Sequence, residues 1–256
     1  RSSDLAAAGI ALTGKIPFIG SFAEFVTGRV YDQIRQEVAY GHTNVKIASS
    51  HAGITLGEDG ATHQTMEDIA LMRALPGMVV INPCDFNQTK AATIAAAEYE
   101  GPVYLRFGRP NVPNFTPAYQ KFEIGKAICM NEGTDVTIFA TGHLVWEAIN
   151  AAEALEAEGV SAEVIDIATI KPLDEEAVIA SAKKTGAVVC AEEHNRCGGL
   201  GELVAGVLAA NAPTPMEFIN GADRFGQSGT PAELMKAYGL DAAHIVEAAK
   251  KVVARK

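Results

Sequence analysis

The feature that most restricts the fold of this chain is a repeated alternation of short β-branched runs with longer helical segments. In the first half, strands are expected at 16–22, 45–49, 78–83 and 103–107, and helices at 5–12, 23–39, 65–75 and 86–99. Such alternation is typical of a parallel sheet covered by helices on both faces. The first half therefore predicts a doubly wound α/β domain.

A second alternating unit follows a Pro-containing stretch, residues 111–122, that has neither helical nor strand period and is typical of a linker. Strands are expected at 136–140, 162–167, 187–191 and 216–219, and helices at 144–158, 175–185, 201–211, 232–238 and 242–253. A length of 256 residues suits two domains of ordinary size. We expect two doubly wound α/β domains with mainly parallel sheets, residues 1–115 and 116–256.

Charge and cysteine content exclude several classes of protein. A formal net charge of -10 argues against nucleic acid or an anionic membrane as the partner, because either would need a basic face. The sequence shows no apolar run of transmembrane length and no signal-peptide pattern. Its four cysteines are spread out without a CxxC pair, which indicates reduced thiols. We therefore expect a cytoplasmic protein whose anion-binding site, if it has one, is local.

The Gly-rich segment Ser49–Gln64 follows an expected strand, at the sheet edge where α/β proteins bind ligands. Gly53, Gly57 and Gly60 would let this loop fold back on itself and bring three polar side chains together: His51, Asp59 and His63. Neutral histidines can donate to hydroxyl or carbonyl oxygens and move protons near pH 7, and the aspartate can accept from a sugar hydroxyl.

Two other interpretations of this loop stay open at this stage. Metal binding is disfavoured because the two histidines are not one helical turn apart and no thiolate or carboxylate completes a zinc-type spacing. A Gly-rich surface turn with incidental histidines fits the spacing about equally well.

Three features outside the loop could contribute to a site. Phe22 and Phe25 are three residues apart at a strand-to-helix junction, where they either pack in the core or form an aromatic surface. Arg109 follows the last strand of the first half and either binds an anion or makes a surface ion pair. The segment Cys197–Gly201 opens a helix but lacks the GxGxxG spacing of a dinucleotide site, which favours close packing of a helix on its strand.

Five motifs spread along the chain form one set: Gly57–Gln64 (GEDGATHQ), the phenylalanine pair after Ile16-Pro17-Phe18, Glu192–His194 with Gly198–Glu202 (EEH, GGLGE), Ile170–Asp174 (IKPLD) and Ser228–Leu234 (SGTPAEL). Together they resemble transketolase. The resemblance covers the pyrimidine-binding and C-terminal domains of that family and implies the C-terminal subunit of a split, two-chain enzyme.

The resemblance implies thiamine diphosphate as the cofactor, held between chains. Phe25 matches the family's ring-stacking aromatic and Phe22 the pocket wall beside it. The domain that holds Mg²⁺ and the diphosphate has no counterpart in these residues. It would belong to a partner chain, the N-terminal subunit, and this chain would supply no metal ligand.

The resemblance also implies roles for four polar residues. His63 matches the histidine that contacts the two-carbon fragment, and Asp59 the acid that reads the donor's hydroxyl configuration. His51 and Arg109 match the residues that hold the sugar phosphate, for which a guanidinium provides a bidentate clamp.

The implied reaction is reversible transfer of a two-carbon ketol unit from a ketose phosphate to an aldose phosphate, as in the pentose phosphate pathway. The cofactor would act as electron sink, and protein groups would orient the substrate and move protons. Two copies of this chain and two partner chains would form a heterotetramer, because half of a cofactor pocket exposes apolar surface.

One residue of the family pattern falls outside the sequence. The glutamate that activates the cofactor aligns immediately before Arg1, and Asp4, Glu24 and Glu37 do not occupy its place. We expect that residues are missing at this end.

Two alternatives to transketolase share its architecture: the beta subunit of a 2-oxo acid dehydrogenase, and the C-terminal part of deoxyxylulose phosphate synthase. Neither is expected to carry the GEDGATHQ loop in this form. A catalytically silent scaffold subunit is an alternative from a different class.

Overall fold

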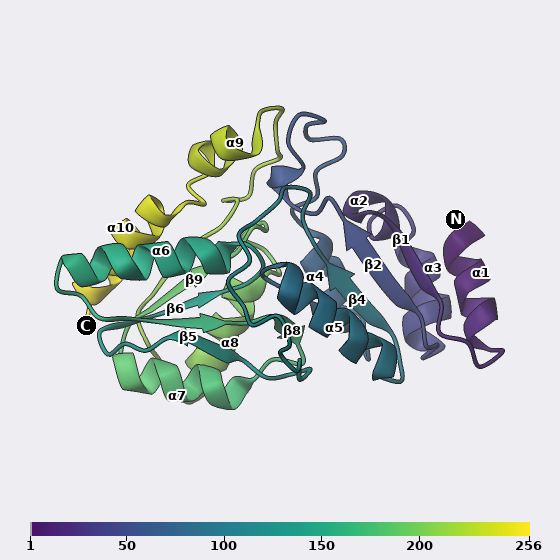
Figure 1. Ribbon diagram of the computed structural model, residues 1–256, viewed down its shortest axis with the longest axis horizontal. Coiled ribbons are helices and arrows are strands. Elements are labelled where there is room, and N and C mark those ends of the chain that lie inside the picture. The colour runs from purple at the N-terminus through teal and green to yellow at the C-terminus, as the bar shows by residue number, and fades with distance from the viewer. Residues whose placement is uncertain (1) are drawn as a thin grey trace.

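The computed structural model describes residues 2–256, which form two sheets lying side by side, each flanked by helices (Figure 1). In the first sheet the order is β1-β2-β4-β3-β8. Its strands are β1 (Phe18–Phe22), β2 (Lys46–Ser50), β3 (Val79–Ile81), β4 (Val103–Arg106) and β8 (Thr169–Lys171). The first four are parallel, and β8 joins β3 in the antiparallel sense.

The second sheet has the order β10-β9-β6-β7-β5. Its strands are β5 (Ile128–Asn131), β6 (Val136–Ala140), β7 (Ala162–Asp166), β9 (Val188–Ala191) and β10 (Met216–Ile219). Only β5, at one edge, runs antiparallel to its neighbour among these strands. Every residue of β6, β7 and β9 is buried, because helices cover both faces of the sheet.

The helices divide in the same way between the two halves. Those of the first half are α1 (Ser2–Ala11), α2 (Ala23–Val26), α3 (Tyr31–Gln33), the π-helix η1 (Ile34–Tyr40), the 3₁₀ turn η2 (Ile54–Leu56), α4 (Asp68–Arg73) and α5 (Phe86–Glu98). Those of the second half are α6 (Leu144–Ala157), α7 (Glu175–Thr185), α8 (Leu200–Asn211), α9 (Pro231–Ala237) and α10 (Ala242–Val253). Within the described part of the chain, none of them has the length and apolar content needed to cross a lipid bilayer.

These elements confirm the predicted fold class, two doubly wound α/β domains with mainly parallel sheets. The stretch 111–122 contains neither helix nor strand, as expected of a linker. The prediction of one continuous helix over 23–39 was wrong. It breaks after α2, where the Thr27 hydroxyl donates to the carbonyl of Ala23 at 2.6 Å and Gly28 follows.

Strand β8 comes from the second half of the chain and completes the sheet of the first. It pairs with β3, and the amide of Asn82 donates to the carbonyl of Ala168 at 2.8 Å. The Lys171 ammonium donates to two carbonyls at the end of α4, Arg73 at 2.8 Å and Leu75 at 2.6 Å. The two halves therefore interlock, and the boundary between residues 115 and 116 stays a prediction.

The carboxyl ends of the strands in one sheet face those of the other. Asn82, just after β3, donates its side-chain amide to Thr141, just after β6, at 3.2 Å. Gln88 at the start of α5 donates to Asp166, the last residue of β7, at 2.5 Å. Loops from both sheets therefore meet in one zone, and the candidate site lies along its rim.

Candidate active site

The loop after β2 carries the polar residues singled out in the sequence. His51 follows the strand directly and has a φ of +59°. This left-handed backbone conformation is rare for residues other than glycine, and such residues are found preferentially at functional sites. The turn η2 comes next, and Gln64 closes the loop. Its side-chain amide donates to the carbonyls of Ile54, Gly57 and Gln227 at 3.0 to 3.1 Å. The loop is therefore a fixed structure.

Two phenylalanines and two histidines form a cluster of rings at the end of β1 and β2. Phe22 stacks on His51 with centroids 3.9 Å apart, and lies parallel to Phe25 at 5.8 Å and 6°. His63 meets Phe25 edge-on, at 5.3 Å and 72°. Arg29 covers one face of the Phe25 ring, 4.1 Å from its centroid. Parallel half-buried rings offer an apolar surface on which a flat heteroaromatic ring can stack.

Burial and nearby charge favour the neutral form of the His51 imidazole. Burial lowers the pKa of His51, the nearby Arg109 guanidinium lowers it further, and Asp59 acts in the opposite direction. A neutral imidazole can donate from one nitrogen and accept at the other. The Nδ1 atom is already paired with the Ser50 hydroxyl at 2.9 Å.

Arg109 and Asp59 lie at the outer rim of the loop. The Arg109 guanidinium donates to the carbonyl of Leu56 at 2.8 Å and pairs with Glu58 at 3.1 Å. Its side chain is 44% exposed, so the remaining N–H groups face solvent. Asp59 is exposed beside Glu58. An incoming anion would have to compete with the Glu58 carboxylate for this guanidinium.

One ring nitrogen of His63 is hydrogen-bonded and, within the described part of the chain, the other is not. Its Nδ1 atom lies 3.0 Å from the Thr62 hydroxyl, and Nε2 makes no hydrogen bond to the described residues. A cavity of about 540 Å³ borders this part of the loop and is lined by both halves of the chain, through Glu24, Thr62, Asn195 and Phe225 among others. The cavity adjoins the ring cluster rather than enclosing it.

Of the six predicted site residues, the structure joins Phe22, Phe25, His51 and His63 through direct ring contacts. Arg109 and Asp59 join them through the loop and through their effect on His51. The chemical roles of all six stay predictions.

The glycines before α8 serve packing, as the sequence indicated. The Glu192 carboxylate occupies the start of this helix and accepts the amides of Leu200 at 2.6 Å and Gly201 at 2.9 Å. A Cβ on Gly199 would overlap that carboxylate, and one on Gly198 would lie 2.5 Å from the Cβ of Ala70. A buried side chain therefore fills the place a phosphate would take.

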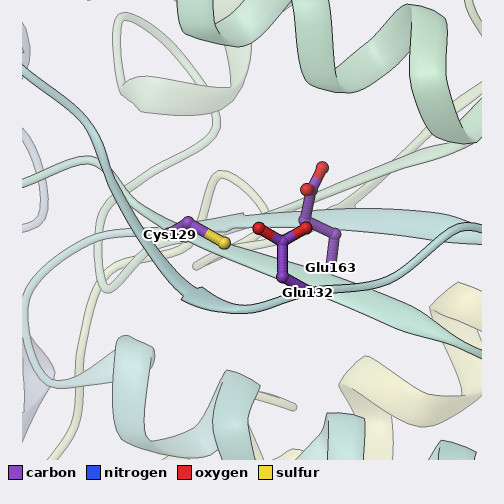
Figure 2. A group of neighbouring side chains, drawn as sticks. All are labelled: Cys129, Glu132 and Glu163. Carbon is purple, nitrogen blue, oxygen red and sulfur yellow. The ribbon is translucent and has the colours of Figure 1, made fainter.

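Cys129, Glu132 and Glu163 lie near one another at the far edge of the second sheet, with ligand atoms spaced as for a metal ion (Figure 2). The ammonium of Lys184 already bridges the two carboxylates, at 2.6 Å from Glu132 and 2.7 Å from Glu163. A bound cation would have to displace this lysine. The geometry favours a structural ion-pair network over a metal centre.

Comparison with known families places the chain. Residues 5–114 match the transketolase pyrimidine-binding domain, and residues 125–245 match the transketolase C-terminal domain. The chain belongs to the transketolase family. The ring cluster and the loop after β2 lie entirely within the matched pyrimidine-binding domain.

Curated relatives match nearly the whole of this transketolase-family chain. It is 46% identical to the 6-deoxy-6-sulfo-D-fructose transketolase subunit SqwH of Clostridium sp. (strain MSTE9), over 98% of this chain and 78% of that protein. It is 38% identical to one of the subunits of the apulose-4-phosphate transketolase of Phocaeicola vulgatus, over 96% and 79%. A solved structure described as a split gene transketolase, inactive beta4 tetramer, has a TM-score of 0.90 at 46% identity and covers 97% of this chain and 79% of its own.

Proposed function

We propose that this chain is the C-terminal subunit of a two-chain transketolase that moves a two-carbon ketol unit reversibly between sugar phosphates with thiamine diphosphate. The observation that carries the proposal is the ring cluster: parallel phenylalanines with the edge of His63 beside them. Membership of the family and the pyrimidine-binding domain match support it.

Each residue of the cluster has a role in this mechanism. When bound, thiamine diphosphate supplies a nucleophilic carbon and an electron sink. Phe25 and Phe22 provide the apolar surface for its pyrimidine ring. His63 donates a hydrogen bond to, or takes a proton from, the oxygens of the transferred fragment, since its free nitrogen is not engaged in the described contacts.

The rim of the loop provides recognition of the sugar. Asp59 accepts from a donor hydroxyl, and Arg109 and His51 bind the terminal anion of the substrate. Binding of a phosphate would replace the exposed Arg109 to Glu58 pair, which costs little because exposed ion pairs contribute at most about 1 kcal/mol. The names of two relatives include a sulfonated sugar and apulose 4-phosphate, so members of this family differ in the sugar they take.

The complete site requires other chains in this proposal. The curated relatives above are named as parts of multi-chain enzymes, and the solved neighbour is described as a split gene enzyme whose beta4 tetramer is inactive. We propose that an N-terminal partner chain supplies the Mg²⁺ and diphosphate site, and that two copies of each chain assemble.

The test is reconstitution. The chain is mixed with its N-terminal partner, Mg²⁺ and thiamine diphosphate, and ketol transfer from xylulose 5-phosphate to ribose 5-phosphate is followed. Transfer by the mixture and none by either chain alone is the expected result. Turnover of pyruvate alone would favour the beta subunit of a 2-oxo acid dehydrogenase, and no turnover of any sugar phosphate would favour a scaffold subunit.

A further inference from the structure

Glu193 lies just beyond the carboxyl end of β9 and reaches the loop of the first domain. Its side chain is 2% exposed, and its Oε1 atom accepts the backbone N–H of Thr55 at 2.6 Å, across 138 residues of sequence. Thr55 is the middle residue of η2, four positions after His51. A buried carboxylate of one domain therefore binds the backbone of the loop that carries the candidate site of the other.

The loop is shaped to receive this carboxylate. Gly53 has a φ of +80°, and a Cβ at this position would overlap the carboxyl group of Glu193. The backbone carbonyl of Glu193 accepts from the Arg106 guanidinium at 2.9 Å, and Arg106 is itself paired with buried Asp68 at 2.7 Å. Both the main chain and the side chain of Glu193 are thereby tied to the first domain.

Glu193 lies at the point where the strand order of the second sheet reverses direction. In the second sheet, β7 and β9 lie on opposite sides of β6, so the direction of the strand order reverses between β6 and β9. Open α/β sheets bind ligands just outside the carboxyl ends of the strands at such a switch point. Here the space outside β6 and β9 receives Asn82 and the Gly53–Leu56 turn of the first domain. In the second domain, the sheet edge at which such folds usually bind ligands therefore contacts a loop of the first domain.

We infer that Glu193 is a positioning residue: its Oε1 atom fixes the turn Ile54–Leu56 and so holds His51 against Phe22. The consequence for turnover rests on the proposed function, whereas the consequence for the loop does not. The other oxygen, Oε2, has no hydrogen-bond partner among the described residues and lies 3.5 Å from His143. Oε1 alone contacts the loop, so an acceptor oxygen at the correct reach is what this contact requires.

Two conservative variants separate reach from charge. Glu193→Gln keeps an oxygen at the position of Oε1 without the charge, whereas Glu193→Asp keeps the charge and withdraws the oxygen by one methylene. In the chain alone, Glu193→Asp should speed amide exchange of Thr55, followed by NMR, by roughly tenfold, the loss of one hydrogen bond. Glu193→Gln should leave that exchange within about threefold of the wild type.

Glu192→Asp is the matched control, because it removes the same methylene from the adjacent buried glutamate, which binds the start of α8 instead of the loop. It should leave Thr55 exchange unchanged. In the reconstituted enzyme, Glu193→Asp should lower kcat/KM by on the order of 10- to 100-fold, since displacement of a positioned group by about 1 Å costs this much. Glu193→Gln should restore most of it.

Equal Thr55 exchange in Glu193→Asp and wild type, or an equal acceleration in Glu192→Asp, would overturn the inference. So would a Glu193→Gln variant as impaired as Glu193→Asp, since charge would then matter rather than reach. Failure of the wild-type assembly to transfer any ketol unit would overturn the proposed function and leave the exchange result standing.

Discussion

The carboxyl ends of the strands have different surroundings in the two sheets. At the carboxyl ends of β1 and β2, the rings of Phe22, Phe25 and His51 are half-buried, and His51 adopts a left-handed backbone. At the carboxyl ends of β7 and β9, Asp166 and the glutamates after Ala191 are fully buried. The first edge stays open to a ligand, whereas the second is closed by the first domain.

This difference shows that the same edge of a doubly wound domain can pack against protein instead of facing a ligand. At the second edge, polar groups contact protein partners: Glu192 binds the start of α8, and Asp166 accepts from Gln88. At the first edge, Arg109 keeps N–H groups exposed and the second ring nitrogen of His63 is not engaged by described residues. Chemistry is therefore expected at the first edge and stability at the second, and substitutions at each can test this division.

The largest effect is expected from His63→Ala. Removal of the group that we propose moves protons at the transferred fragment should lower kcat by roughly 10²- to 10⁴-fold. The melting temperature should change little, because the ring is only partly buried at the loop surface. Initial rates at saturating substrate in the reconstituted enzyme measure this.

A control for this substitution is His42→Asn, at the opposite end of β2, where an asparagine tolerates the φ of +47°. It should retain wild-type turnover. If His63→Ala instead lost stability and kept its kcat, the first edge would be structural and the division between the two edges would fail.

Much of the fold could be predicted because parallel strands buried on both faces have nearly continuous apolar sequences. The predicted strand over 136–140 matches β6 residue for residue. Helix α7 begins and ends as predicted, since Asp174 caps its first turn and Gly186 ends it with a left-handed residue. The antiparallel edge strands β5 and β8 escaped prediction because they lack a continuous apolar run over their whole length: β5 alternates half-buried with exposed residues, and β8 has one apolar residue between Thr169 and Lys171.

The site was predictable only as far as local sequence determines it. The three-residue spacing of the phenylalanines and the glycines of the loop indicated which side chains could meet. The bond from Thr55 to Glu193 could not be read from either segment, because it depends on how two domains pack. The sequence shows that Glu193 is an acidic residue just after an expected strand, but only the folded structure shows that it accepts the Thr55 N–H.

The second largest effect is expected from Arg109→Ala. Loss of the exposed guanidinium should raise KM for phosphorylated sugars by about 10- to 100-fold, the value of roughly one charged hydrogen bond, with kcat little changed. Arg35→Ala, an exposed arginine on η1, is the control. An equal rise in KM for unphosphorylated sugars would show that Arg109 does not bind the terminal anion.

The second edge is tested by Asp166→Asn. Burial raises the pKa of Asp166 to about 7 from 3.8, and its Oδ1 atom has no partner among the described residues. Between these two pH values the folded chain keeps a proton that the unfolded chain has released, so stability falls as pH rises. An asparagine is neutral throughout and should stabilise the chain by on the order of 2 kcal/mol at pH 8 and hardly at all at pH 4.

Melting temperatures at the two pH values measure this, with exposed Asp32→Asn as control. The gain at pH 8 should be several degrees for a chain of this size. A variant that lost turnover without a change in melting temperature would place catalytic chemistry at the second edge and break the comparison.

The smallest effect is expected from Phe25→Leu. A leucine keeps most of the apolar surface but loses the aromatic face, which contributes about 1 kcal/mol beyond burial. The Kd for thiamine diphosphate in the reconstituted enzyme should therefore rise about fivefold, which titration calorimetry can resolve. Phe86→Leu, on the exposed face of α5, should leave Kd unchanged. An unchanged Kd in Phe25→Leu would mean that this ring only supports Arg29, which packs on it, and that the cofactor ring lies against Phe22 instead.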